Sequence, residues 1–308
     1  CFVLAQTMNS IVRGMGYAKR SLVNFLSSII INLILDALFV LVFKWGVKGA
    51  AFATVIGNFV CVVLAIQFLC SNRASVKLHL MNIKPDKEII KTILSIGVSG
   101  FIAQFALSIV TLVFNHVCRV YGGNTAVAAY GIISTVFMLI YMPMIGLGQG
   151  IQPIVGVNYG SQHFQRVKET LIKAFEYATI FCVLMFLIFE IFSPQIILAF
   201  GGASDLSLSE IAVTGMRIYG IMTPFVGMQM VGANFFQYIG KAKQSMFLSA
   251  LRQIILLIPL TLILPIFFNM SGVWAATPLS DGISFVITMA LVKIELTVLN
   301  KVDKTNSD

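Results

Sequence analysis

Long runs of apolar residues, separated by short polar connections, dominate the pattern of this sequence. Eight of these runs reach about 20 residues or more, which is the length that a helix needs to cross a bilayer. They cover residues 21–43, 49–70, 91–119, 126–156, 169–198, 206–237, 245–268 and 272–297. Barrel strands would alternate in segments of about ten residues, so the runs predict membrane-spanning helices. Residues 1–12 look like the end of one more helix, and we expect the beginning of the protein to be missing from this chain.

The composition supports a membrane protein. Hydrophobic residues make up 58% of the chain and charged residues only 11%, whereas a soluble protein carries about 25% charged residues. The expected fold class is therefore all-α, a polytopic membrane helix bundle. Five scattered cysteines and three distant histidines argue against a disulfide framework or a zinc site. Neither an HExxH motif nor a nucleophile–base spacing is present, which argues against an enzyme.

The basic residues gather on alternate connections between the predicted helices. Of the 21 Lys and Arg residues, sixteen fall on one side of the membrane, three on the other, and Arg217 and Arg252 lie within helices. Cytoplasmic loops carry the excess of basic residues, so the C-terminus is expected in the cytoplasm. The net charge of +9 therefore reflects membrane topology, and nucleic-acid binding is not expected.

The longest polar connection predicts a division into two lobes. Residues 71–90 are polar, contain a proline and several lysines, and are expected to form a cytoplasmic linker. Residues 1–70 would then be the end of the first lobe and residues 91–299 the second lobe. Residues 300–308 would form a cytoplasmic tail.

An internal repeat connects the two parts. GYAKRS (16–21) resembles GKAKQS (240–245), and GAAFAT (49–54) resembles GVWAAT (272–277), at offsets of 224 and 223 residues. The first full helix pair would therefore correspond to the last pair. This predicts two parallel lobes of six helices each in the intact protein. Parallel repeats with a binding site between them are a common arrangement of transporters.

Asp36 is the acidic residue placed deepest within a predicted helix. A charge in the hydrocarbon region is costly and indicates function. Asn32, four residues earlier, lies on the same helix face, and Thr54 and Asn9 lie in the neighbouring segments. A carboxylate, amides and a hydroxyl supply oxygen ligands suited to a sodium ion or a shared proton. The alternative is that these groups only hold helices together.

The repeat favours a functional role for this cluster. At the offset of 224 residues, Asn32 and Asp36 correspond to Leu256 and Leu260. A purely architectural role would more naturally appear in both halves.

Other polar residues within the helices allow more than one interpretation. Arg252 and Asp281 could form a structural ion pair. Glu190 and Arg217 lie toward helix ends and are expected to reach the bilayer surface. Three further polar residues could line a substrate cavity or serve helix packing: Gln104, Asn115 and Tyr130.

Several sequence runs resemble the multidrug and toxic compound extrusion (MATE) family. RGMGYAKRS, NLILDALFV and GVKGAAFATVIGN are similar to its fourth-to-sixth helix signature. IGVSGFIAQ, AAYGIIS, GLGQGIQPIVGVNYG and LRQIILLIPL are similar to its seventh, eighth and eleventh helices, and GVWAATPLSD to the start of its twelfth. The resemblance implies twelve helices in two lobes around a central cavity. It also implies export of organic, often cationic or amphipathic compounds in exchange for sodium ions or protons.

The resemblance assigns a site as well. The cation-coupling residues of prokaryotic members with an N-lobe site match Asn9, Asn32, Asp36 and Thr54. Their partner aspartate belongs to the first helix, which this chain lacks, and the carboxylates that other members carry in the seventh and tenth helices have no acidic counterpart here. A monomeric, multi-pass transporter of the plasma or inner membrane is implied, with no cofactor and no metal beyond a sodium ion at Asp36.

The alternative within the same superfamily is a flippase for lipid-linked oligosaccharides. Such a carrier would be expected to need cationic residues in its cavity to bind the pyrophosphate group. Arg217 and Arg252 are the intramembrane cations of this sequence, which argues against this alternative.

Overall fold

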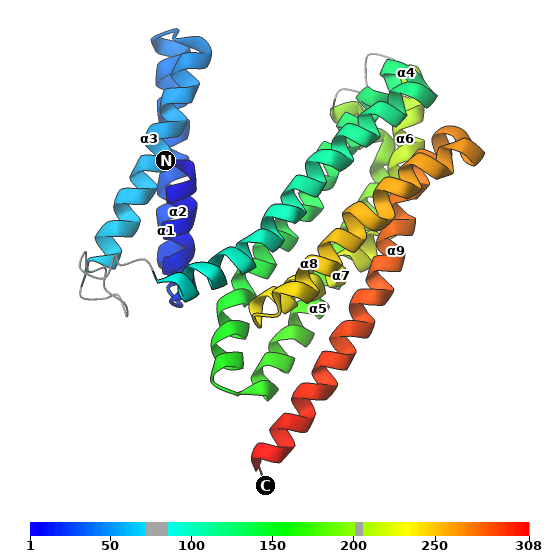
Figure 1. Ribbon diagram of the computed structural model, residues 1–308. Helices are drawn as coiled ribbons and strands as arrows, with labels where there is room; N and C mark the ends of the chain where they lie inside the picture. The colour runs from blue at the N-terminus through cyan, green and yellow to red at the C-terminus, as the bar shows by residue number, and fades with distance from the viewer. Residues whose placement is uncertain (72–85, 201–205, 308) are drawn as a thin grey trace. The chain divides into compact units, whose positions relative to one another are not determined.

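A computed structural model describes residues 1–71, 86–200 and 206–307 of the chain (Figure 1). The chain divides into two compact units, Cys1–Asp86 and Lys87–Asp308, called unit 1 and unit 2 below. The described residues form helices and turns, with no strand among them, so the predicted all-α membrane bundle is confirmed. Most of the expected linker, residues 71–90, lies outside the described residues.

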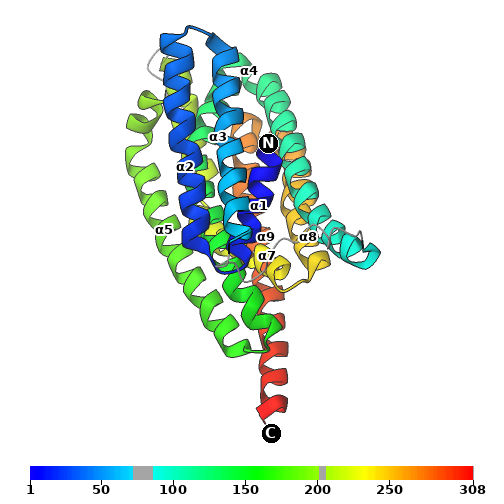
Figure 2. The same ribbon diagram turned by 90° about the vertical axis from the view of Figure 1, so that its left-hand side faces the viewer.

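Unit 1 is a short bundle of antiparallel helices. Its elements are α1 (Phe2–Gly14), α2 (Ala18–Asp36), the π-helical turn η1 (Ala37–Val42) that continues α2, and α3 (Gly46–Leu69). The chain reverses between η1 and α3, so α2 and α3 lie side by side (Figure 2). The outward faces of these helices are apolar; Leu33 and Leu41, for example, are 69% and 72% exposed. Side chains of this kind suit contact with lipid.

Unit 2 contains the remaining helices. They are α4 (Lys87–Gly160), α5 (Phe164–Ala199), α6 (Leu206–Gly220), α7 (Thr223–Tyr238), α8 (Ala242–Ala250), the π-helical turn η4 (Leu251–Leu257) and α9 (Ile258–Ser307). α5 packs against α4, α6 and α7, and α9 packs against α4, α6 and α7. Large apolar side chains such as Trp274, Phe114 and Phe235 are fully buried between these helices.

Two of the long helices each contain a reversal. The backbone of α4 leaves helical geometry at Gly123, and that of α9 leaves it at Asn269. α6 and α7 form a pair bent by 52°. Each half of α4 therefore corresponds to one predicted span, and the bent pair to another. The last two predicted spans are α8 with η4 and the first part of α9, and then the second part of α9, which continues through the expected tail to Ser307.

Small residues let the helices of the repeat approach closely. On α3 every fourth position from 49 to 65 is small and buried: Gly49, Ala53, Gly57, Cys61 and Ala65. At the offset of 223 residues, the second part of α9 carries the same pattern, again buried: Gly272, Ala276, Ser280, Ser284 and Thr288. Small side chains at this spacing form the contact face of membrane helices. We call these two sets the small-residue stripes.

Hydrogen bonds across the two helix pairs support the repeat. In unit 1 the Ser28 hydroxyl donates to the Gly57 carbonyl over 2.7 Å. Ser28 corresponds to Arg252 and Gly57 to Ser280 at the offsets of the repeat. In unit 2 the Ser280 hydroxyl donates to the Arg252 carbonyl over 2.8 Å. The same pair of positions is therefore joined in both halves, with donor and acceptor exchanged.

A methyl group at Gly57 tests how closely α2 and α3 must pack. A Cβ atom there would lie 2.9 Å from Asn32 Cβ and 2.9 Å from the Ser28 carbonyl oxygen, so one helix would have to shift. We predict that Gly57→Ala destabilises the full-length protein by about 1–3 kcal/mol, measured by thermal unfolding in detergent. Gly131→Ala is the matched control, because a Cβ atom at this helical glycine meets nothing within 4 Å. Equal melting temperatures for the two variants would show that the close approach is not needed.

Candidate functional site

Polar side chains follow one face of α2. They recur every three or four residues, the spacing that places side chains on one face of a helix. They are Ser21, Asn24, Ser28, Asn32 and Asp36. The first three are buried and the last two are half-buried. We call this set the polar seam.

The polar seam packs against the small-residue stripe of α3. The backbones approach closely at Gly57, where the Cα and Cβ atoms of Asn32 lie nearby. This closeness lets the Ser28 hydroxyl reach the backbone of α3 at Gly57. A hydrogen bond between membrane helices contributes about 1 kcal/mol. The small residues of α3 thus let this helix approach closely enough to shield the polar groups of α2 from lipid.

Asp36 lies at the point where the α-helical geometry of α2 gives way to a π-helical turn. It is the last α-helical residue, and the π-helical turn η1 begins at Ala37. π-Helical turns inside helices are frequent at functional sites. Asp36 Oδ1 and Asn32 Nδ2 are buried without a hydrogen-bond partner among the described residues. A buried carboxylate oxygen without a partner is costly in hydrocarbon, so this oxygen is a candidate ligand for a cation or a proton.

The other two predicted members of the cation site, Thr54 and Asn9, lie in different surroundings. Thr54 follows the buried Ala53 on α3; it is itself exposed, and its hydroxyl donates to the Ala50 carbonyl of its own helix over 2.9 Å. Asn9 is buried on α1, and its Oδ1 atom has no partner among the described residues. Counting residues from the turn between α1 and α2 at 1.5 Å per residue places Asn9 about 20 Å from Asp36 along the helices. The structure therefore brings Asn32 and Asp36 together and leaves Asn9 at a different depth.

Asn24 and Ser28 were not predicted as site residues. Asn24 is completely buried, and both polar atoms of its side chain lack a partner among the described residues. The signal in the sequence is the continuation of the three-to-four-residue polar spacing from Asn32 back to Ser21. A single serine or asparagine in an apolar run is common, so the spacing becomes informative only as a series.

The three predicted cavity residues occupy different surroundings in α4. Gln104 is exposed, and its backbone carbonyl accepts a hydrogen bond from the Ser108 hydroxyl. Asn115 is half-buried. Tyr130 is buried and stacks on Phe114 across the reversal of α4, with ring centroids 4.9 Å apart. Tyr130 therefore packs in the core of unit 2, whereas Gln104 faces outward from it.

Two pairs of oppositely charged side chains lie within the predicted spans of unit 2. Arg252 Nε lies 2.7 Å from Asp281 Oδ1, which confirms that these two residues pair. Glu190 and Arg217, both expected to reach the bilayer surface, are about half exposed and approach each other to 3.7 Å, and Arg217 also donates to the Ser193 hydroxyl. The contact itself was not predicted, because each residue was considered on its own helix, whereas α5 and α6 pack together.

Comparison with known sequences points to one family. The family model MatE matches residues 100–263. "Multidrug export protein MepA" of Staphylococcus aureus (strain bovine RF122 / ET3-1) is 26% identical over 295 residues, covering 94% of this chain and 63% of the relative. The protein of the same name from Staphylococcus saprophyticus is 25% identical over 283 residues, covering 89% of this chain and 58% of the relative. The chain thus spans less than two thirds of the length of these curated relatives.

Comparison with solved structures identifies the fold. A structure described as "Crystal structure of MATE in complex with MaL6" superposes with a TM-score of 0.90 at 23% identity, covering 97% of this chain and 67% of that one. Another, described as "Outward-facing conformation of a multidrug resistance MATE family transporter of the MOP superfamily", has a TM-score of 0.87 at 23% identity, covering 96% and 66%. The chain therefore has the same fold as these structures.

Removing the Ser28 hydroxyl tests whether the seam between α2 and α3 depends on its hydrogen bond. We predict that Ser28→Ala lowers the stability of the full-length protein by about 1 kcal/mol, because the buried contact with Gly57 is lost. Ser108→Ala is the matched control, because this hydroxyl is exposed and bonds within its own helix. Thermal unfolding in detergent measures both variants. If Ser28→Ala unfolds no earlier than Ser108→Ala, the hydrogen bond does not stabilise the seam.

Proposed function

This chain belongs to the MatE family, and from that premise we propose that the protein exports small organic compounds across a membrane in exchange for sodium ions or protons. Its substrates would be organic, often cationic or amphipathic, molecules. The relatives called multidrug export proteins support drug export. We assign the coupling ion to unit 1 and infer a multi-pass protein of the cell membrane, with its C-terminus in the cytoplasm.

The observation that carries this proposal is the unpartnered carboxylate oxygen of Asp36. It lies within a 25-residue apolar span, Ala18–Val42, next to the unpartnered amide of Asn32. No group of three or more His, Cys, Asp or Glu side chains gathers within the described residues. The part of the proposed site that lies in this chain combines one carboxylate, that of Asp36, with neutral polar groups. Such a site suits a monovalent cation that binds and leaves readily. Thr54 and Asn9 stay in the proposed set on the strength of the family resemblance.

The proposed mechanism is alternating access between outward-open and inward-open states. Binding of a cation at Asp36 would favour the state with low affinity for the substrate, so the substrate would leave on the outside. Loading of the substrate from the cytoplasm or the inner leaflet would require the cation site to empty. The exchange depends on a difference in affinity between the two states, as any such coupling does.

The organisation of the chain completes the proposal. Residues 1–70 would be the end of an N-terminal lobe, residues 71–90 a cytoplasmic linker, and residues 91–299 the C-terminal lobe, followed by the tail at 300–308. The protein would act as a monomer in the bilayer, with small molecules as its partners and with neither a cofactor nor nucleic acid. It would not be an enzyme.

Asp36→Asn tests the coupling site in the full-length protein. Proteoliposomes would be loaded with a fluorescent cationic dye, and its efflux followed under a sodium gradient and, separately, a proton gradient. We predict that one gradient accelerates efflux from wild-type vesicles and that Asp36→Asn reduces this acceleration by about tenfold or more, because the ion loses its carboxylate ligand. Glu176→Gln is the matched control, since this carboxylate is exposed on α5.

Two outcomes would contradict the proposal in different ways. A folded Asp36→Asn protein that still responds to the gradient would place the coupling ion elsewhere. If neither gradient moves the dye with the wild-type protein, drug export itself is wrong, and a flippase assay with a lipid-linked oligosaccharide becomes the next measurement.

A further inference from the structure

The second half of the repeat carries different charges at the seam between its helices. Where unit 1 has Asn32 and Asp36, the corresponding residues Leu256 and Leu260 are apolar. Where unit 1 has the small Ser28, unit 2 has Arg252, whose carbonyl keeps the equivalent hydrogen bond to the neighbouring helix. Unit 2 therefore retains the packing of the repeat but places a guanidinium in the seam.

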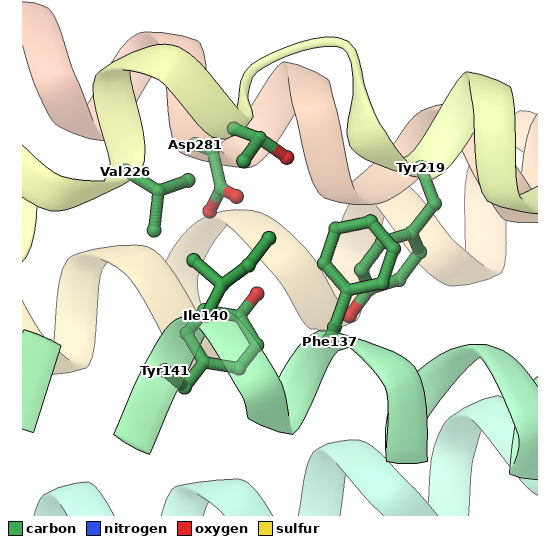
Figure 3. A pocket seen from close by; sticks show the side chains of 7 residues that line it. Phe137, Ile140, Tyr141, Tyr219, Val226 and Asp281 are labelled. Carbon is green, nitrogen blue, oxygen red and sulfur yellow. The ribbon is translucent and has the colours of Figure 1, made fainter. Parts of the chain in front are cut away.

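Arg252 is held in a fixed orientation by two neighbours. Its side chain is 12% exposed and that of Asp281 is 5% exposed. Besides the 2.7 Å contact of its Nε atom with Asp281, its Nη2 atom approaches the Tyr141 hydroxyl to 3.5 Å, and the guanidinium lies over the Tyr141 ring. In Figure 3, Asp281 points into a tightly packed space that Tyr141 and Tyr219 also line. Asp281 is thus enclosed by its neighbours in unit 2.

Arg252 also borders a cavity inside unit 2. The cavity has a volume of about 140 Å³, which is room for about four water molecules at ~30 Å³ each. Polar side chains line one part of it, namely Gln229, Asn234, Ser249, Arg252 and Gln253, and apolar residues line the rest, namely Leu107, Met230 and Ala233. The volume is sufficient for a small charged group of a larger molecule, with apolar walls beside it.

We propose that this cavity binds the carboxylate of an organic substrate, with Arg252 as its anchor. A guanidinium has five N–H donors and no acceptor, and among the described residues its recorded hydrogen bonds go to Asp281 and Tyr141. The remaining donors, together with the amides of Gln229, Asn234 and Gln253, suit an acceptor with two oxygens. This inference rests on the proposed export function and specifies one class of its substrates, those with a carboxylate.

Charge explains why the cavity suits an acceptor and not a cation. Asp281 compensates the charge of Arg252, but Arg252 lines the cavity and Asp281 is not among its lining residues, so an incoming group meets the guanidinium. A cationic group in this cavity would face a like charge without an acidic neighbour among the lining residues. In the proposed division of roles, unit 1 binds the coupling cation at Asp36 and unit 2 binds the anionic end of a zwitterionic substrate.

A pair of dyes that differ only in the acceptor group tests the inference. The probes are a fluorescent rhodamine with a free carboxylate and the methyl ester of the same dye. The full-length protein in proteoliposomes would be assayed for gradient-driven efflux of each dye, and the purified protein for binding of each dye by fluorescence anisotropy. We expect wild type to prefer the acid over the ester by about tenfold, the size of a charge-assisted hydrogen bond.

Three variants distinguish loss of the proposed carboxylate site at Arg252 from a general loss of structure or transport. The double variant Arg252→Gln, Asp281→Asn removes both charges and leaves no charge of the pair uncompensated. Ala233→Leu fills the cavity and leaves the ion pair intact. The control is Arg217→Gln with Glu190→Gln, which neutralises a half-exposed pair outside the cavity. The preference for the acid should fall about tenfold in the first two variants and stay at the wild-type value in the control.

The outcomes distinguish this inference from the proposed function. If wild type exports the ester but shows no preference for the acid, or if the first two variants keep that preference, the carboxylate site is wrong and drug export stands. If wild type moves neither dye under either gradient, the proposed export function is wrong. The binding preference for the acid over the ester, measured by anisotropy, then tests the carboxylate site independently of transport. If the double variant does not fold, the preference of Ala233→Leu for the acid over the ester still tests the carboxylate site.

Discussion

Hydrocarbon does not solvate polar groups, so a polar side chain in a membrane helix is tolerated where another helix covers it. This constraint organises unit 1. Five polar side chains of α2 lie in one seam, and the small residues of α3 let the two backbones approach until Ser28 reaches the carbonyl of Gly57. Packing against a neighbouring helix does not give Asp36 a hydrogen-bond partner: its Oδ1 atom is buried without one among the described residues. That unmet requirement is the physical reason for placing a coupling cation or proton there.

The two halves of the repeat meet the same constraint with different chemistry. Both bring a stripe of small residues against the neighbouring helix and join the same two positions by a hydrogen bond. Unit 1 leaves an acidic oxygen open, whereas unit 2 compensates its buried Arg252 with Asp281 and keeps a small polar cavity beside it. The repeat thus supplies the same packing in both units, and in our proposal the residues that differ within the seam decide which ligand each unit can bind. A cation site and an acceptor site in one protein would suit exchange of a cation for a zwitterionic compound.

The sequence predicts the helices well because each span needs an apolar run, and such a run is readable directly. It also predicts that Asn32 and Asp36 share a face, since four residues make about one helical turn, and that Arg252 and Asp281 pair. The two π-helical turns, η1 and η4, have no comparable signal in the residue pattern. Asn24 and Ser28, each considered alone, also have no signal in the residue pattern, because their importance follows from the residues of α3 that lie opposite them. The separation of Asn9 from Asp36 along the helices follows from where the turn between α1 and α2 falls, and the structure supplies that position.

The most direct measurement follows the carboxylate itself. Infrared difference spectra of the full-length protein, recorded on addition of sodium ions and separately on acidification, report the stretching bands of carboxyl groups. If Asp36 is the coupling residue, one of these changes shifts a carboxyl or carboxylate band in the wild-type protein, and the band is absent from the difference spectrum of Asp36→Asn. Wild-type and Asp36→Asn spectra that agree under both conditions would show that Asp36 neither binds the ion nor takes up the proton, and that it only holds α2 in place.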